Sequence, residues 1–374
     1  MAKLLVTGDF VVSKTYAIDA NSTVKALFEQ SDLNVVNLES PVTFAIETDK
    51  IVKTGPHLKA NAKATKKALH DLKIGLATLA NNHILDYGSK GVTDTLQFCK
   101  ENAVETVGAN LNLQEAQQTY YTTIDNHTIA IVNFAENEWS SAGVDSAGAN
   151  PMDLVDNTRQ IIEAKKKAKF VFVIVHGGHE YHNLPSLRMK KQYRFYVDHG
   201  ADLVIGHHTH CVSGWEKCNG GSIFYSLGNF LFTKPSVFSD WYFGLILSIL
   251  IDENGKLQTE LIPCKQLKES FELQLLEGDE KQQLEKKIGE LNTIIHDDTL
   301  LAKSWKEYVN KSAADYLNLW SPLSSIRNKY VRAALRKLGI NFLNKKIVAL
   351  YVNLMRCEAH ADLSKEALAQ YLKK

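Results

Sequence analysis

The chain has 374 residues and a formal net charge of +1, with 45% hydrophobic and 23% charged residues. This composition fits a folded globular protein with one large core and an appended domain. The net charge argues neither for nor against a nucleic-acid partner over the whole chain, and we expect no such partner. The five scattered cysteines do not resemble a disulfide framework, and no apolar run approaches the roughly 18 residues of a membrane span. Together with an N-terminus that lacks the pattern of a signal peptide, this predicts a cytoplasmic protein.

Short apolar runs alternate with amphipathic segments over residues 1 to about 265. The apolar runs predict strands at residues 3–9, 33–39, 74–80, 104–110, 169–176 and 201–207. The amphipathic segments predict helices at residues 61–72, 91–102 and 157–168. Segments 122–135 and 241–264 each contain a turn rich in Asn, Asp or Gly, which favours an antiparallel hairpin. The fold class is therefore α/β, with a second sheet expected.

From about residue 270 the strand signals stop. Leu284, Ile288, Leu291 and Ile295 recur at helical spacing, and the chain beyond them also has a helical pattern, with a break at Pro322. We therefore predict two domains, an α/β domain at residues 1–268 and an α-helical domain at residues 269–374.

Polar side chains stand at the ends of five predicted strands. They are Asp9, Glu39, Asn82 with its neighbour His83, His176, and the histidines of the segment GHHTH. Functional groups gather beyond the carboxyl ends of strands in α/β sheets. Imidazoles and carboxylates together suit Zn, Mn or Fe. The sequence therefore predicts a metal site at this edge.

The segment GHHTH, residues 206–210, contains three histidines. In an extended backbone His208 and His210 would point to one side and His207 to the other. We therefore expect His208 and His210 to be ligands and His207 to support or pack against them. Glu180, just past residues 169–176, is either a group near the substrate or metal, or a solvated loop carboxylate.

The C-terminal region contains a basic amphipathic segment. No acidic residue occurs from Tyr316 to Cys357, and an apolar stripe runs beside the positive charges. The basic residues are Arg327, Lys329, Arg332, Arg336, Lys337, Lys345 and Lys346. Such a helix can lie on an anionic membrane or meet a polyanionic polymer, and it can equally be a solvated face of its own domain.

Six motifs occur in an order that resembles the bacterial CapA (PGA_cap, poly-γ-glutamate capsule biosynthesis) family, a branch of the calcineurin-like metallophosphoesterases. The motifs are GDF, NLESP, LANNHILDYG, VHGGHEY, GHHTH and YSLGNF. The resemblance covers residues 1 to about 235. It implies a four-layer αββα sandwich with a two-metal site between loops at the strand ends.

Carried over by motif, the resemblance implies a role for each strand-end residue. Asp9 and His210 would hold one metal, and Asn82, His176 and His208 the other, with Glu39 as the bridge. His83 would face the substrate. Val11 stands where the wider superfamily usually has a second ligand, and Glu39 replaces the usual Asp. Of the two divalent ions expected, Mn, Fe or Zn, the first would therefore be weakly held, with water, Glu180 or a substrate oxygen completing its shell.

The function implied is that of a metal-dependent hydrolase, specifically a phosphoesterase, linked to capsule or surface-polymer synthesis. Its partner would be a phosphorylated or polyanionic substrate. One alternative is hydrolysis or transfer at an amide of a γ-glutamyl chain, since metal-activated water also attacks carbonyls. Another is a non-catalytic subunit of polymer synthesis with a degenerate metal site. The basic C-terminal helix would provide contact with a membrane or with a capsule-synthesis complex.

Overall fold

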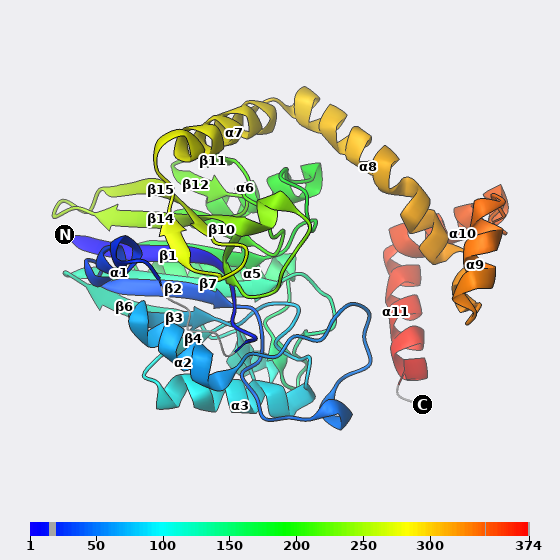
Figure 1. The fold of residues 1–374 in the computed structure, drawn as a ribbon, viewed down its shortest axis with the longest axis horizontal. Helices are drawn as coiled ribbons and strands as arrows, with labels where there is room; N and C mark the ends of the chain where they lie inside the picture. The colour runs from blue at the N-terminus through cyan, green and yellow to red at the C-terminus, as the bar shows by residue number, and fades with distance from the viewer. Residues whose placement is uncertain (15–19, 341, 373–374) are drawn as a thin grey trace. The chain divides into compact units, whose positions relative to one another are not determined.

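A computed structural model describes residues 1–14, 20–340 and 342–372 of the chain. Within residues 1–301 two β-sheets stack on each other, and helices cover their outer faces (Figure 1). Three layers of buried apolar side chains separate these four layers, one between the sheets and one under each set of helices. The expected αββα sandwich is confirmed.

The larger sheet contains eight strands among the described residues, in the order β16-β15-β14-β1-β2-β3-β4, with β13 beside β1. The strands are β1 (Ala2–Val11), β2 (Leu33–Leu38), β3 (Ile74–Thr78), β4 (Glu105–Val107), β13 (Asn229–Phe232), β14 (Phe243–Ile251), β15 (Leu257–Gln266) and β16 (Leu273–Leu275). Strands β1 to β4 run parallel, so their carboxyl ends meet at one edge. The predicted hairpin at residues 241–264 is β14–β15.

The smaller sheet has the order β11-β12-β10-β9-β7-β6. Its strands are β6 (Tyr120–Ile124), β7 (His127–Ala135), β9 (Phe170–His176), β10 (Leu203–His207), β11 (Trp215–Cys218) and β12 (Gly221–Phe224). The predicted hairpin at residues 122–135 is β6–β7, and its turn residues Asp125 and Asn126 both have positive φ, as a two-residue hairpin turn requires. A short pair, β5 (Ala109–Asn110) and β8 (Gly148–Ala149), stands apart.

Strand β9 shows why these runs are continuously apolar. Phe170, Phe172 and Ile174 face the layer between the sheets, and the alternating valines between them face the outer helices. Successive side chains of a strand point to opposite faces, so a strand buried on both faces contains no polar alternation.

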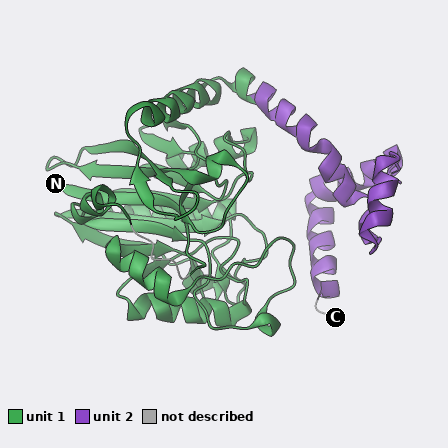
Figure 2. Cartoon of the chain, viewed as in Figure 1, with its two compact units in different colours: residues 1–301 green, residues 302–374 purple. Residues whose placement is uncertain are grey.

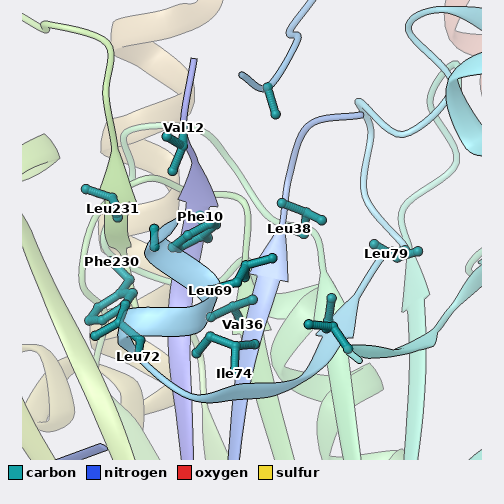
Figure 3. Packing of buried hydrophobic residues seen from close by; sticks show 14 of the residues in the cluster. Phe10, Val12, Val36, Leu38, Leu69, Leu72, Ile74, Leu79, Phe230 and Leu231 are labelled. Atoms are coloured by element: carbon teal, nitrogen blue, oxygen red, sulfur yellow. The ribbon is translucent and has the colours of Figure 1, made fainter. Parts of the chain in front are cut away.

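Helices α1 (Ser22–Glu29), α2 (Ala62–Asp71) and α3 (Gly88–Glu101) cover the larger sheet. Figure 3 shows part of this layer, with Leu69 of α2 beside Phe10 of β1 and Val36 of β2. Helices α5 (Leu154–Lys167) and α6 (Leu187–Asp198) cover the smaller sheet, and the one-turn α4 (Leu113–Ala116) lies near β5 and β8. This packing holds the strand ends that carry the candidate site.

The chain divides into compact units at residues 1–301 and 302–374 (Figure 2). This boundary lies later than the predicted one after residue 268. The reason is α7 (Gly278–His296): its apolar stripe, including Leu284 and Ile295, is buried in the core of the first unit. Helical periodicity identified the helix but not the surface against which it packs.

The second unit is helical, as predicted for the C-terminal region. It contains most of α8 (Asp298–Trp320), then α9 (Lys329–Lys337), α10 (Lys345–Arg356) and α11 (Glu358–Leu372). A short 3-10 turn beginning at Pro322 separates α8 from α9, at the predicted break. Among the described helices, none is long and apolar enough to cross a membrane.

Candidate metal centre

The six residues predicted as ligands come together where the ends of the two sheets adjoin. Asp9 lies in β1, Glu39 directly follows β2, and Asn82 lies in the turn after β3. His176 ends β9, and His208 and His210 follow β10. The larger sheet thus supplies the oxygen ligands and the smaller sheet the imidazoles. All six side chains are buried.

Five of these residues form two overlapping triads. Glu39, His176 and His208 make one, and Asp9, Glu39 and His210 make the other; within each triad the candidate ligand atoms lie within 4.8 Å of one another. Glu39 Oε1 is 3.6 Å from Nε2 of His176 and 3.8 Å from Nε2 of His210. Glu39 is therefore the residue that the two triads share.

The spacing of the remaining polar atoms fits shared ions. The Asn82 Oδ1 and His208 Nδ1 atoms each lie 3.0 Å from His176 Nε2. Two atoms that bind one ion at about 2.1 Å are about 3.0 to 3.6 Å apart, depending on the bond angle. His210 Nδ1 is also 3.0 Å from Oδ1 of Asn229, which can accept its proton and leave Nε2 as the ligand atom.

The carboxylate of Glu39 is the clearest sign that a cation belongs here. It is fully buried, and neither oxygen has a hydrogen-bond partner. Burial first, and then the negative charges of Asp9, Glu180 and Glu138, raise the pKa of Glu39 well above its ordinary value. A buried carboxylate without a partner is costly, and a divalent ion would supply that partner.

Asp9 is held by a close approach of two backbone segments. A Cβ atom on Gly8 would overlap the carbonyl oxygen of Gly228, to which the Asp9 amide donates a 3.0 Å hydrogen bond. The Asn37 amide donates to Asp9 Oδ1 at 2.7 Å and lies 3.0 Å from His176 Nδ1. Burial alone would raise the pKa of Asp9, but hydrogen bonding to His210 and nearby positive charge hold that pKa below its ordinary value.

The segment GHHTH is a turn, which corrects the expected extended backbone. Strand β10 ends at His207, and His208 and His210 have φ of +84° and +56°, in the left-handed region. The turn directs the His208 backbone amide at the Asp9 carboxylate, 3.2 Å away. The expected side-chain arrangement still holds, because His207 points into the core and its Nε2 donates to the Thr7 carbonyl at 2.8 Å.

The environment of His176 favours the neutral form of its imidazole. Burial, and then the neighbouring charges of His208, His207 and His210, lower the pKa of His176 well below its ordinary value. Only an unprotonated ring nitrogen can bind a metal, so this environment favours the ligating form.

His83 belongs to a second buried group beside the ligands. Its Nδ1 donates to Oδ2 of Asp86 at 2.7 Å, and the Lys53 ammonium pairs with the other oxygen of Asp86. The backbone of His83 is fixed by a 3.0 Å hydrogen bond to the Asn81 side chain. Burial lowers the pKa of His83, and Asp86 partly opposes this shift. The sequence analysis missed Asp86 and Lys53, although the spacing of three residues from His83 to Asp86 is a signal for the first.

Two exposed glutamates lie near the centre. Glu180 is exposed, and among the described residues no hydrogen bond or ion pair joins it to the six candidate ligands; its charge acts on Glu39 through space. Glu138 Oε1 lies 3.6 Å from His208 Nε2. Glu138 comes from the loop after β7 and is part of no motif, so nothing in the sequence pointed to it.

Aromatic side chains border the centre on one side. Tyr181 stacks on Phe238 with ring centroids 4.4 Å apart, and Trp241 lies 4.8 Å from the His210 ring. Val11, at the position of the expected missing ligand, is buried against Trp241. The candidate metal position beside Asp9 and His210 thus receives no ligand from residue 11.

Comparison with known families matches residues 3–234 to the model described as bacterial capsule synthesis protein PGA_cap. The PGA biosynthesis protein CapA of Bacillus subtilis is 38% identical over 218 residues, which are 56% of this chain and 56% of that protein. The capsule biosynthesis protein CapA of Bacillus anthracis is 33% identical over 255 residues, 64% of this chain and 59% of that protein. The match therefore spans less than two thirds of either relative.

Among solved structures, a phosphatase from Mycoplasma pneumoniae aligns with 70% of this chain and 92% of its own, at a TM-score of 0.44 and 13% identity. A putative 5′-nucleotidase from Staphylococcus aureus, solved with alpha-ketoglutarate, aligns with 77% of this chain and 58% of its own, at a TM-score of 0.44 and 14% identity.

Proposed function

Since this chain belongs to the bacterial capsule synthesis protein PGA_cap family, we propose that it is a metal-dependent hydrolase of the phosphoesterase type that acts in the synthesis of a capsule or another surface polymer. The observation that carries the proposal is the buried, unpartnered Glu39 carboxylate shared by two ligand triads. The expected substrate is phosphorylated or polyanionic. A cytoplasmic location stays a prediction.

Two divalent ions, Mn, Fe or Zn, fit the donor atoms present. Asp9, Glu39 and His210 would hold one, and Glu39 with Asn82, His176 and His208 the other. When bound, such a pair activates a water for attack at phosphorus and stabilises the attacking and leaving oxygens. The first ion has fewer protein ligands because Val11 is apolar and packed against Trp241, so we expect it to be held more weakly.

His83 is placed to handle the proton of the leaving group. Asp86 accepts the proton on Nδ1, which leaves Nε2 as the nitrogen for the substrate. Lys53 balances the Asp86 charge and holds the pair in place. In this proposal the imidazolium form of His83, which Asp86 stabilises against the effect of burial, donates its Nε2 proton to the leaving oxygen and returns to the neutral form that keeps the Nδ1 proton.

Glu180 and the aromatic border would meet the rest of the substrate. Glu180 is exposed next to Tyr181, which is 42% exposed and whose ring stacks on Phe238. We propose that Glu180 contacts the substrate or completes the weaker metal site, and that Tyr181 and Phe238 pack against the leaving group.

A second function is favoured by the names of the relatives, which refer to PGA and capsule synthesis. In that case the same centre would hydrolyse or transfer an amide of a γ-glutamyl chain. A third reading is a non-catalytic subunit with a degenerate site, which the missing ligand at Val11 would favour.

One screen separates these functions. The protein, purified with its metal, is assayed against phosphomonoesters, phosphodiesters, nucleotide-sugars and γ-glutamyl peptides, with His210→Ala and Glu39→Gln proteins as matched controls. Turnover of phosphoesters that both variants lose supports the proposal, and turnover of γ-glutamyl peptides alone supports the second function. Metal binding without turnover of any of these substrates would favour the non-catalytic reading.

A further inference from the structure

Helix α9 (Lys329–Lys337) of the second unit separates basic from apolar residues around its axis. Each residue advances about 100° around an α-helix. The apolar arc consists of Tyr330, Val331, Ala334, Leu335 and, at the C-cap, Leu338. The basic arc consists of Lys329, Arg332, Arg336 and Lys337. The two arcs lie on opposite sides of the helix.

Most of the apolar arc is exposed, although Leu335 is half-buried. Tyr330 is 74% exposed, Leu338 72% and Val331 47%, and Phe342, shortly after the helix, is 60% exposed. A cluster of large apolar side chains exposed to solvent is typical of a surface that binds a protein or a membrane. Single exposed leucines are common on protein surfaces, but here several large apolar side chains are exposed together.

The charge around this helix is of one sign. Residues 316–357 include eight Lys and Arg residues and no Asp or Glu. Among the described residues, no ion pair involves any basic residue of α9. Its positive charge is therefore available to a negative partner.

We propose that the α9 surface, made of Tyr330, Val331 and Leu338 with Arg332 and Lys337 at its two edges, binds an anionic lipid bilayer. A bilayer with anionic headgroups offers both requirements together, negative charge at its surface and an apolar layer beneath it. A soluble polyanion would satisfy only the charges. A second copy of the chain would bring the same positive segment and be repelled. This goes beyond the proposed hydrolase function and does not depend on it.

The test is co-sedimentation of the full chain with vesicles of phosphatidylcholine alone and of phosphatidylcholine with phosphatidylglycerol. We expect binding only to the second kind, weakened by added salt. Each basic residue near an anionic surface contributes roughly 5-fold in affinity. Arg332→Gln with Lys337→Gln should therefore weaken binding by roughly 30-fold.

The matched control is Lys63→Gln with Lys66→Gln in α2, which removes the same charge from exposed positions in the first unit. It should leave vesicle binding unchanged. Tyr330→Ser with Leu338→Ser tests the apolar part and should weaken binding by at least about 10-fold, since each side chain loses its place in the apolar layer. Tyr330, Leu338 and Lys337 are exposed and Arg332 is partly exposed, so the melting temperature of each variant should stay close to that of the parent.

Several outcomes would overturn the proposal. Equal binding to both kinds of vesicle, or to neither, removes the role of anionic lipid. An equal loss of vesicle binding in the α2 control would show that binding depends on the net charge of the protein and not on the α9 surface. Retained binding after Tyr330→Ser with Leu338→Ser, together with competition by soluble poly-γ-glutamate, would identify a polymer site. Self-association that these serine substitutions abolish, without vesicle binding, would identify a contact between copies.

Discussion

Nε2 of His176 lies 3.6 Å from Oε1 of Glu39, so an imidazole at the end of a strand in the smaller sheet faces a carboxylate at the end of a strand in the larger one. Both side chains are buried. The candidate centre therefore exists only when the two sheets are stacked, and folding of the sandwich and formation of the site are one event.

Replacing the shared carboxylate tests the bridging position. Glu39→Gln keeps the shape of the side chain but removes its charge, so we expect loss of at least one of the bound metal equivalents. The metal-free variant should be more stable than the metal-free parent, because an unpartnered buried carboxyl is replaced by a neutral group. Elemental analysis measures the metal content, and thermal melting in the presence of a chelator measures the stability of the metal-free proteins. Full metal content in the variant would remove Glu39 from the ligand set.

The pH dependence of stability without metal follows from the raised pKa of Glu39. Its folded pKa lies above the ordinary 4.5, so the stability that it contributes is present at low pH and is lost as pH rises toward the folded pKa. His176 acts in the opposite direction, because its lowered pKa costs stability as pH falls below the ordinary 6.5. The comparison of metal-free parent with metal-free Glu39→Gln isolates the first effect.

The advantage of Glu39→Gln in melting temperature should grow as pH increases from 4.5 toward neutral, and it should disappear when metal is added. A difference that stays constant with pH would show that the carboxyl does not titrate in this range.

The three histidines of GHHTH should separate by their effects. His208→Ala and His210→Ala should lose metal, since both rings belong to the triads. His207→Ala should keep metal but lower the free energy of unfolding by about 1 to 3 kcal/mol, because it leaves a cavity and an unpaired Thr7 carbonyl. Metal titration measures the loss of metal, and chemical denaturation measures the free energy of unfolding. Metal loss in His207→Ala equal to that of its neighbours would contradict the observed arrangement.

His83 should affect turnover and not metal binding. His83→Ala should retain metal and lower turnover by roughly 10² to 10⁴, least for substrates with good leaving groups. Asp86→Asn should reproduce part of this loss, because it removes the acceptor that fixes Nδ1. Rates on an activated and an unactivated ester, with metal content and melting temperature, decide the matter. If metal content and activity fall together, His83 only supports the loop.

Tyr181 should affect substrate affinity. Its φ of +61° is unfavourable for a residue with a side chain, so Tyr181→Gly relieves strain while it removes the ring. We expect KM to rise by roughly 10-fold for substrates with a ring in the leaving group, with kcat little changed, whereas Tyr181→Phe should behave like the parent. An unchanged KM in Tyr181→Gly would exclude the ring from substrate binding.

Much of the architecture could be predicted from local patterns. Runs such as residues 169–176 are too short and too uniformly apolar for anything but strands buried on both faces, and β9 has those bounds almost to the residue. Because parallel strands end at a common edge, the polar residues that follow them could be placed together without a structure. That reasoning selected Asp9, Glu39 and the histidines.

Other features depended on contacts between distant parts of the chain. The Lys53–Asp86–His83 group, the nearness of Glu138 to His208, and the stacking of Tyr181 on Phe238 join loops whose sequences show no shared pattern. The left-handed turn at His208 and His210 depends on the Asp9 carboxylate that receives the turn's amide.

The sequence alone determined several of the strands and helices, among them β9 and α2, and which polar groups stand at the strand ends, since periodicity and strand-end position are local properties of the chain. Only the tertiary structure decided that α7 belongs to the first unit, that Glu39 is shared between two triads, and that Asp86 and Lys53 stand behind His83. These relationships depend on how two sheets and their loops pack in three dimensions, and local periodicity carries no information about that packing.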